Sequence, residues 1–579
     1  MVIIMRILLL AILILLSQTI FAQVTVEIKI TGIGGDTAEN VRLYLSIVDQ
    51  KNHPLLTEQQ LKRLHKKAPE EIKKALQPYG YYAPKITSDL TETKPSNWLA
   101  NYQIDPGSPI PIAELNIDIS EEMRNDPPFQ QFLNELPLKK GGTFNHLDYE
   151  SIKSNLARLA SERGYFDARF AKHRVEIDLE TYEARVYLNY DGGPRFNYGE
   201  IILKQNVLKP ELIRRYIPFE SGSPYSLEEL LELQQALNDT NFFRTVEVSP
   251  GNPVPGSTDI PIHVELSEKK PQRITFGLGY ATNTGARTKL GWDISPLNRR
   301  GHRLDNQLNV SQIGYSLSSR YYVPVLNPLT DRLIYTVGII NEETDQTEST
   351  ALTVGVSLER DHNKWRETIS LNYQKEKFKV ADDQGVSNLL IPGVHWTRTW
   401  AKERILVLDG VRFDLSFRGA TREIFSDTDF FQTQTGIKVI TPLGRKDRLI
   451  SSGRIGATWT DEFENLPTSI RFFAGGGQSV RGYPYQSLGP RSTTGEVTGG
   501  KYLMLGSIEY EHSFNDKWGA ALFYDVGNAY NELDTKLKRG AGIGARWQTP
   551  IGPVRIDIAQ GLDKPGKPWR LHFSIGPDL

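Results

Sequence analysis

The sequence predicts a transmembrane antiparallel β-barrel of about 16 strands, preceded by a secretory signal and three small α+β domains. Three observations carry this prediction: an apolar N-terminal segment, helix and strand patterns that alternate up to about residue 268, and short period-two segments from there to the C-terminus. We therefore expect a signal over 1–22, domains over 23–98, 99–190 and 191–268, and a barrel over 269–579.

The N-terminus has the three-part layout of an export signal. Arg6 precedes an apolar core, and a short polar stretch leads to Ala22, after which we expect cleavage. Ile20 is larger than the residue usually preferred at that position, so an uncleaved N-terminal anchor is the alternative. Both readings place the chain outside the cytoplasm.

Composition excludes several function classes. The chain has no cysteine, which excludes a disulfide scaffold, a thiolate metal site and a cysteine nucleophile. Its 68 Lys and Arg residues balance 69 Asp and Glu residues, so it lacks the basic footprint of a nucleic-acid-binding protein. No two-histidine helix motif or Gly-x-Ser-x-Gly elbow is found, and we expect neither a cofactor nor an enzyme. A hydrolase assembled from distant barrel residues stays open.

A loose repeat divides the first half of the chain. Helix patterns end in the triplets Gly80–Tyr82, Gly164–Phe166 and Asn241–Phe243. Each triplet places a residue that tolerates the left-handed conformation at a helix end, followed by two aromatics that begin a strand. Similar turns with a helix cap, Gly141–Asn145 and Gly222–Ser226, precede the second and third triplets. Three α+β units follow from this repetition.

The second half reads as membrane strands with one apolar and one polar face. The last strand is the clearest case, because Trp569, Leu571 and Phe573 alternate with polar Arg570, His572 and Ser574. A soluble β-sandwich or barrel would alternate equally well, but aromatics near strand ends favour a membrane girdle. Gly540, Gly542 and Gly544 share the inner face of one strand and leave room for a segment inside the barrel.

One loop and one strand are the candidate site. The glycine-dense loop 475–483 carries a single arginine, Arg481. On a later strand Leu522, Tyr524 and Val526 face outward, so Asp525 faces the lumen, where a carboxylate needs a cation.

These residues resemble the outer-membrane protein-assembly superfamily that includes BamA, the two-partner secretion transporters and TamA. The resemblance rests on Val480, Arg481, Gly482 and Tyr483 in the loop and on Phe523, Asp525 and Gly527 in the strand. It implies that the loop folds back into the barrel and that Arg481 contacts Asp525, with Glu509 a second inward candidate. It also identifies the soluble units as POTRA domains, whose count of three is similar to the TamA branch.

The resemblance implies an assembly factor that inserts or translocates outer-membrane proteins such as autotransporters. Sheet edges of the soluble domains would capture unfolded clients by strand addition. A weak barrel seam, with Gly277 and Gly279 facing Phe573 and Gly576, would template client strands. The same glycines also suit barrel curvature, which is the alternative explanation for them.

Partners and location follow from the same resemblance. We expect a Gram-negative outer membrane with the POTRA domains in the periplasm, contact with outer-membrane lipid, and no nucleic-acid partner. A TamB-like protein anchored in the inner membrane would dock on the first domain, within about residues 25–98. Rival functions are a two-partner-type secretion pore for one exoprotein, a diffusion porin, and a shared role in phospholipid transport.

Overall fold

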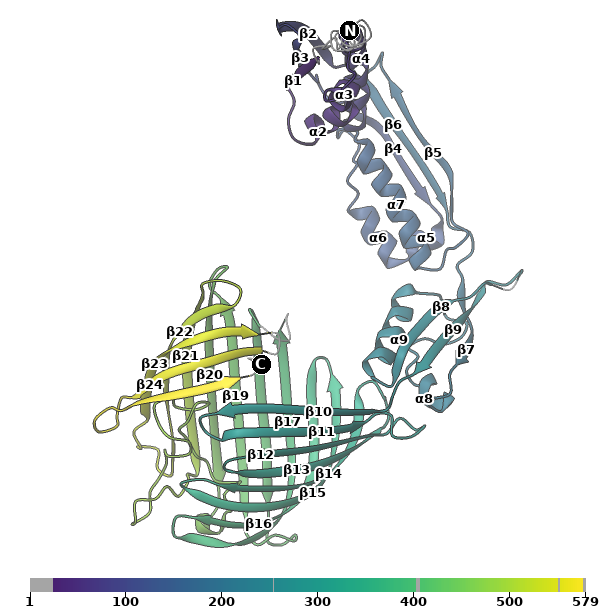
Figure 1. Ribbon diagram of the computed structural model, residues 1–579. Coiled ribbons are helices and arrows are strands. Elements are labelled where there is room, and N and C mark those ends of the chain that lie inside the picture. Colours follow the sequence, from purple (N-terminus) through teal and green to yellow (C-terminus); the bar gives the residue numbers. More distant parts are fainter. Residues whose placement is uncertain (1–23, 254, 402–406, 550–551, 576–579) are drawn as a thin grey trace, which may run out of the picture. The chain divides into compact units, whose positions relative to one another are not determined.

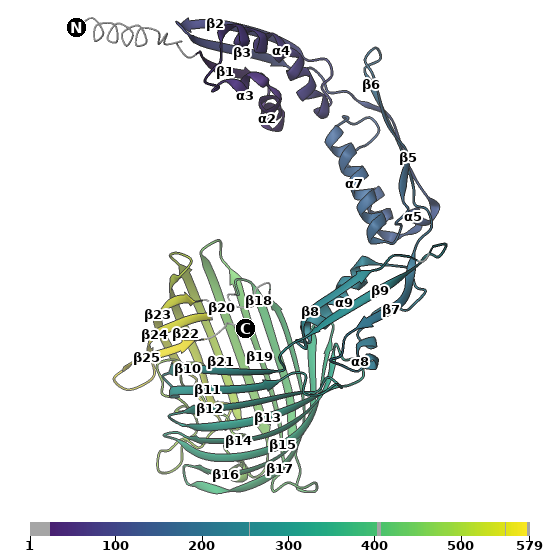
Figure 2. The ribbon, with the colours of Figure 1, turned by 45° about the vertical axis from the view of Figure 1, so that its right-hand side comes forward.

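The computed structural model describes residues 24–253, 255–401, 407–549 and 552–575, and its described strands form three three-stranded sheets and one 16-stranded sheet. Figures 1 and 2 show the three small sheets and the large one. The expected signal 1–22 with its cleavage residue Ala22, and the seam residue Gly576, lie outside the described residues. Among the helices that are described, none has the length and hydropathy needed to cross a bilayer.

The first domain has sheet order β1-β3-β2, with β1 parallel and β2 antiparallel to the central β3. Its elements are β1 (Thr25–Thr31), α2 (Gly35–Tyr44), α3 (Ser46–Gln50), α4 (Glu58–Leu76), η1 (Gln77–Tyr79), β2 (Lys85–Lys94) and β3 (Asn97–Asp105). Thr57 and Gln60 form a capping box at the start of α4.

The boundary expected at residue 98 divides β3 and needs correction. Trp98, Ala100, Tyr102 and Ile104 on this strand are all buried in the core of the first domain. Because the central strand of a sheet cannot leave it without opening the core, the first domain extends to Asp105.

The second and third domains repeat the plan, with sheet orders β4-β6-β5 and β7-β9-β8. The second comprises β4 (Ile112–Ile119), α5 (Glu121–Asn125), α6 (Pro127–Asn134), α7 (His146–Glu162), β5 (Arg169–Asp178) and β6 (Glu183–Asp191). The third comprises β7 (Asn197–Lys204), α8 (Pro210–Arg214), α9 (Leu227–Asp239), β8 (Phe243–Pro250) and β9 (Asp259–Glu268). Asn145 caps α7 by accepting from the Leu147 N–H.

The repeated triplets have the left-handed residue that the sequence predicts. Gly80, Gly164 and Asn241 have φ values of 86°, 85° and 58°. A Cβ on Gly80 would lie 2.2 Å from the Phe144 carbonyl oxygen, and one on Gly164 would lie 2.9 Å from the Tyr225 Cβ. Each glycine thus meets the aromatic of the next repeat's turn motif, which explains why these two motifs recur together.

The barrel is one antiparallel sheet in which each strand pairs with the next along the chain (Figure 1). Its strands are β10 (Gln272–Ala281), β11 (Gly285–Ile294), β12 (Arg303–Ser311), β13 (Gly314–Pro324), β14 (Asp331–Glu343), β15 (Thr347–His362), β16 (Trp365–Val380), β17 (Asp383–Ala401), β18 (Gly410–Ala420), β19 (Phe430–Pro442), β20 (Asp447–Trp459), β21 (Tyr502–Ser513), β22 (Trp518–Tyr530), β23 (Lys538–Thr549), β24 (Gly552–Gly561) and β25 (Trp569–Ile575).

Side chains alternate along these strands as a membrane barrel requires. On β22 the outward Leu522 and Tyr524 are exposed, whereas the inward Phe523 and Asp525 are buried. The long connection between β20 and β21, residues 460–501, includes the short helix η2 (Phe463–Asn465) and packs on the inner wall. This loop fills the space that inward glycines leave.

The first domain should lose stability in mild acid. Burial lowers the pKa of His65 below its ordinary value of 6.5, against a smaller opposing effect of Asp89, and the His65 Nδ1 lies 2.9 Å from the Tyr102 hydroxyl. Below that value the unfolded domain binds more protons than the folded one, so stability falls as the pH drops through about 6.5. Hydrogen exchange of residues 25–105 in the full chain, corrected for intrinsic rates, should be faster at pH 5.5 than at pH 7.5.

A His65→Gln variant is the control, because glutamine can bond to the Tyr102 hydroxyl but does not titrate. It should show little of this pH dependence. Equal pH dependence in both proteins would assign the effect to another group.

Candidate functional site

The loop reaches the inner wall because three backbone positions lack a side chain. A Cβ on Gly540 of β23 would lie 2.0 Å from the Arg481 carbonyl oxygen, and one on Gly561 would lie 3.0 Å from the Tyr483 ring. Gly482 itself has a φ of 91° and passes so close to β24 that a Cβ would lie 2.5 Å from the Gln560 carbonyl carbon. Larger residues at any of these positions would lift the loop from the wall.

Arg481 binds carboxylates from three strands of the wall. Its Nε and Nη2 donate to Asp525 at 2.7 and 2.9 Å in a bidentate pair, and its backbone N–H donates to the same carboxylate at 3.0 Å. Its Nη1 lies 2.6 Å from Glu509 and 3.1 Å from Asp557. The Phe523 ring covers one face of the guanidinium, with its centre 3.4 Å from Cζ. Arginine suits this site because its planar fork stays charged.

A second arginine, Arg546 of β23, continues the network along the wall. Its guanidinium lies 2.6 Å from each of Glu509, Glu511 and Asp557, and it is almost fully buried. Arg448 of β20 pairs with Glu511 at 2.5 Å. Each shared carboxylate is therefore held by two cations, which makes the network one connected unit from β20 to β24.

The remaining motif residues secure the loop around Arg481. Val480 is fully buried, and the Gly482 N–H donates to the His572 Nε2 at 2.9 Å. The Tyr483 hydroxyl accepts from the Asp563 N–H at 3.2 Å. A Cβ on Gly527 would lie 2.5 Å from the Met504 carbonyl oxygen, so this residue permits close strand approach rather than touching the loop.

A separate arginine fixes the start of the loop. Arg471 donates to Asp383 of β17 at 2.7 Å and to the carbonyl oxygens of Leu466, Glu464 and Thr498. Its side chain is fully buried. The loop is thereby held on both the β17 side and the β21–β24 side of the barrel.

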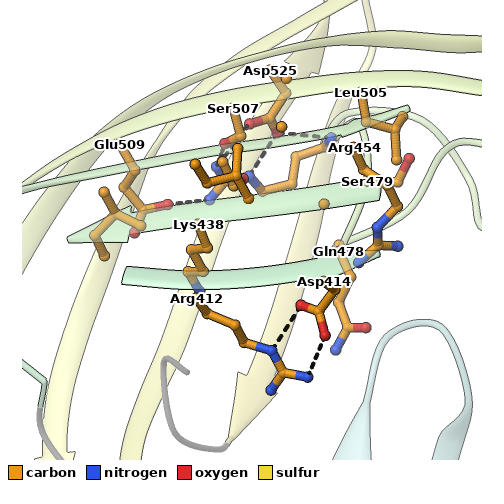
Figure 3. Close-up of a pocket in the computed structure, with 18 of the residues that line it drawn as sticks. Arg412, Asp414, Lys438, Arg454, Gln478, Ser479, Leu505, Ser507, Glu509 and Asp525 are labelled. Atoms are coloured by element: carbon orange, nitrogen blue, oxygen red, sulfur yellow. Dashed lines mark hydrogen bonds and ion pairs between the residues drawn. The ribbon is translucent and has the colours of Figure 1, made fainter. Parts of the chain in front are cut away.

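The lumen keeps a polar cavity of about 840 Å³ beside the network (Figure 3). Arg412 and Lys438, opposite each other on β18 and β19, line it together with Arg454 of β20. Figure 3 shows Arg412 donating to Asp414 on one side of the cavity. On the other side, Ser507 donates to Asp525. The loop therefore narrows the lumen without filling it.

The barrel closes where β10 meets β25. Among the described residues no ladder pairs these two strands, and the Phe573 N–H donates to the hydroxyl of Thr282, directly after β10, at 3.3 Å. The Tyr280 and Phe573 rings lie 6.3 Å apart on the outer face. β10, on one side of the seam, has 10 residues, whereas β17 has 19. Gly277 and Gly279 lie on the inner face of β10, and a Cβ on Gly277 would meet nothing closer than 3.7 Å.

Residues 262–578, more than half of the chain, match the profile described as the Omp85 superfamily domain. The chain belongs to the Omp85 superfamily. Residues 27–106 match the profile described as POTRA domain TamA domain 1, and residues 129–191 and 196–269 match the POTRA profile described as surface antigen variable number repeat.

Individual relatives are distant. The chain is 25% identical over 232 residues to the outer membrane protein assembly factor BamA of Nitratidesulfovibrio vulgaris, covering 36% of this chain and 29% of that protein. It is 21% identical over 528 residues to BamA of Neisseria meningitidis serogroup B, covering 78% and 65%. The crystal structure of Haemophilus ducreyi BamA lacking POTRA domains 1–3 superimposes with a TM-score of 0.69 at 18% identity, covering 81% of this chain and 99% of that one. That likeness supports the fold: a near-closed antiparallel barrel preceded by POTRA domains.

Sequence reasoning missed most of the network around Arg481 in this Omp85 barrel. Strand alternation placed Arg546 and Asp557 on the inner face, but it did not show that they join Glu509 and Arg481. Glu511 and His572 were also missed as partners. The available signal was the recurrence of inward charges on four consecutive strands, β21 to β24.

Replacing Arg481 with alanine should strongly destabilise the barrel, because the Asp525 carboxylate would stay buried without its cation. We expect the free energy of unfolding to fall by about 3–5 kcal/mol. Urea unfolding in liposomes, followed by tryptophan fluorescence, measures this change. Arg491→Ala in the same loop is the control, since Arg491 is exposed and donates to backbone carbonyls. The Arg481→Ala/Asp525→Ala double variant should recover part of the loss; equal effects in Arg481→Ala and the control would contradict a buried pair.

Replacing Gly540 with alanine should displace the loop, because the new methyl group would overlap the Arg481 carbonyl oxygen. Trypsin added outside intact vesicles should cut within 460–501 faster than in the unaltered protein. Gly277→Ala is matched to it as another inward barrel glycine, where the nearest atom to an added Cβ is 3.7 Å away. If trypsin cut the loop of both variants at the same rate, the Gly540 contact would not be what holds the loop against the wall.

Proposed function

We propose that this chain is a TamA-like outer-membrane assembly factor with three periplasmic POTRA domains, which inserts or translocates β-barrel proteins such as autotransporters. Membership of the Omp85 superfamily and the TamA-type first-domain match support the class. The observation that carries the mechanism is the seam between β10 and β25, where the described residues show no ladder.

A seam whose described residues form no ladder offers what a client strand needs. Each edge of an open sheet presents backbone N–H and C=O groups that can pair with an incoming strand whatever its sequence. Leu278 and Phe276 keep the outer face of β10 apolar, so a strand added there would enter directly at the lipid boundary.

The loop network has a supporting role in this proposal. Arg448, Arg481 and Arg546 join β20 to β24 through shared carboxylates, and the loop reaches β25 through His572. This network would keep the C-terminal wall in shape at a seam where the described residues of β25 and β10 form no ladder.

The POTRA sheets support client capture before insertion. Their orders leave β1 and β2, β4 and β5, and β7 and β8 as edges. Unfolded outer-membrane proteins would add strands at such edges, because the bonding groups belong to the backbone. A TamB-like partner anchored in the inner membrane would bind the first domain in the same proposal, and lipid of the outer membrane would surround the barrel.

A secretion pore of the two-partner type is the second candidate, because the lumen holds a cavity of about 840 Å³ lined by polar side chains. The loop, anchored by both Arg471 and Arg481, opposes passage of a chain through that lumen. A role in phospholipid transport to the outer membrane would use the same seam.

A disulfide across the seam tests the proposal. Tyr280→Cys/Phe573→Cys would introduce the chain's only two thiols, on outward side chains whose rings are neighbours. The locked protein should insert an unfolded autotransporter barrel into liposomes no faster than lipid alone, and a reductant should restore the rate. A lock between β21 and β22, Ile508→Cys/Tyr524→Cys, joins strands that are already paired and should leave the rate unchanged.

Full activity of the seam-locked protein would refute a lateral seam. Steady conductance without accelerated insertion by the unlocked protein would instead favour the secretion pore.

A further inference from the structure

The outward face of β16 carries three lysines beyond its apolar belt. Lys375, Lys377 and Lys379 alternate with the inward residues Glu376 and Phe378, which are buried. All three lysines are exposed, and none of them forms an ion pair with another described residue. Charges on a lipid-facing strand are costly within hydrocarbon, so this segment must lie outside it.

Other residues on the same outward face show how deep in the membrane the lysines lie. Ile369, Leu371 and Tyr373 form an apolar run on this outward face, and it is preceded by Glu367, which accepts a hydrogen bond from Trp396 of β17. Tyr373 is the last outward apolar residue of β16 and marks the outer edge of the hydrocarbon, as interfacial aromatics do. Lys375 is the first outward residue beyond it.

Strand direction assigns the side of the membrane. β10 enters the barrel from the POTRA domains, and successive strands are antiparallel, so β16 runs in the same direction as β10. The end of β16 therefore lies on the cell-surface side. Figures 1 and 2 show β16 beside β17 in the barrel wall.

Neighbouring strands leave two of the three charges without a carboxylate opposite. Lys375 lies across from Leu352 and Asn388, and Lys377 across from Thr350 and Val386. Only the outermost position differs: Lys379 lies across from Glu348 and Gln384. Two cations about 7 Å apart thus face the headgroup level of the outer leaflet.

The inner face of the same segment is fixed by the lumen loop, which holds the lysines in place. Glu376 accepts from the Ser469 hydroxyl at 2.5 Å, and Asp383 in the adjoining β17 binds Arg471. A rigid strand presenting aligned cations binds an anion with less loss of side-chain and backbone freedom than a mobile loop would.

We propose that Lys375 and Lys377 form a docking site for the phosphate groups of lipopolysaccharide, the anionic glycolipid of the outer leaflet. The site would orient the wall opposite the seam in the membrane. This inference rests on the proposed outer-membrane location and is independent of the proposed insertion activity.

Binding of fluorescently labelled lipopolysaccharide to the detergent-solubilised full chain, followed by anisotropy, tests the site. Lys375→Gln/Lys377→Gln should raise the Kd roughly thirty-fold, since each lysine near an anionic surface contributes about 1 kcal/mol. Lys66→Gln/Lys67→Gln makes the same charge change on exposed residues of α4 and should have no effect. Lys379→Gln should have a smaller effect than either inner lysine, because Glu348 lies opposite.

Two further binding measurements test whether the phosphate groups of lipopolysaccharide are what the lysines bind. Lipopolysaccharide stripped of phosphate should bind the unaltered protein as weakly as intact lipopolysaccharide binds the double variant, and millimolar inorganic phosphate should compete poorly. An unchanged Kd in the double variant, or equal binding of the stripped glycolipid, would overturn the proposal. The heat-dependent gel shift of the barrel verifies that the double variant is folded, and the seam-lock assay is read separately, so failure of either proposal is distinguishable.

Discussion

The buried guanidinium of Arg481 is the interaction around which the candidate site is organised. A loop that enters a barrel must replace the water that hydrated its charge, and Asp525, Glu509 and Asp557 do so from three different strands. Glu509 and Asp557 also bind Arg546, so the two arginines share two of these carboxylates, whereas Asp525 pairs with Arg481. The wall glycines are a consequence of this contact, because a loop whose charge binds the wall must also bring its backbone against it.

The rigid ion network and the weak seam therefore lie next to each other in one sheet. The ion network connects β20 to β24, and the neighbouring β25 meets β10 without a ladder in the described part of the chain. An assembly factor that offers an edge to a client needs a wall that does not unravel from that edge. Because the network stops one strand before the seam, it stiffens the wall without closing the barrel.

Much of the architecture was accessible from sequence because membrane strands obey a simple rule. The alternation along Trp569 to Ser574 and the inward direction of Asp525 follow from a period of two, which a structure has little freedom to violate. The end of the first domain was not accessible, since β3 is a central strand and local patterns do not show which sheet a strand joins. Arg471 was missed for a related reason: its partner Asp383 is 88 residues away, and no local spacing connects them.

The order of synthesis gives the loop contact a further consequence. Every carboxylate that binds Arg481 lies later in the chain than Arg481 itself, on β21, β22 and β24, and the His572 that accepts from Gly482 lies on the last strand. The loop therefore cannot seat until the end of the polypeptide has emerged and paired. A barrel truncated before β24 would keep Arg481 in its lumen without the Asp557 carboxylate. The loop therefore takes its final position only after the C-terminal strands are in place.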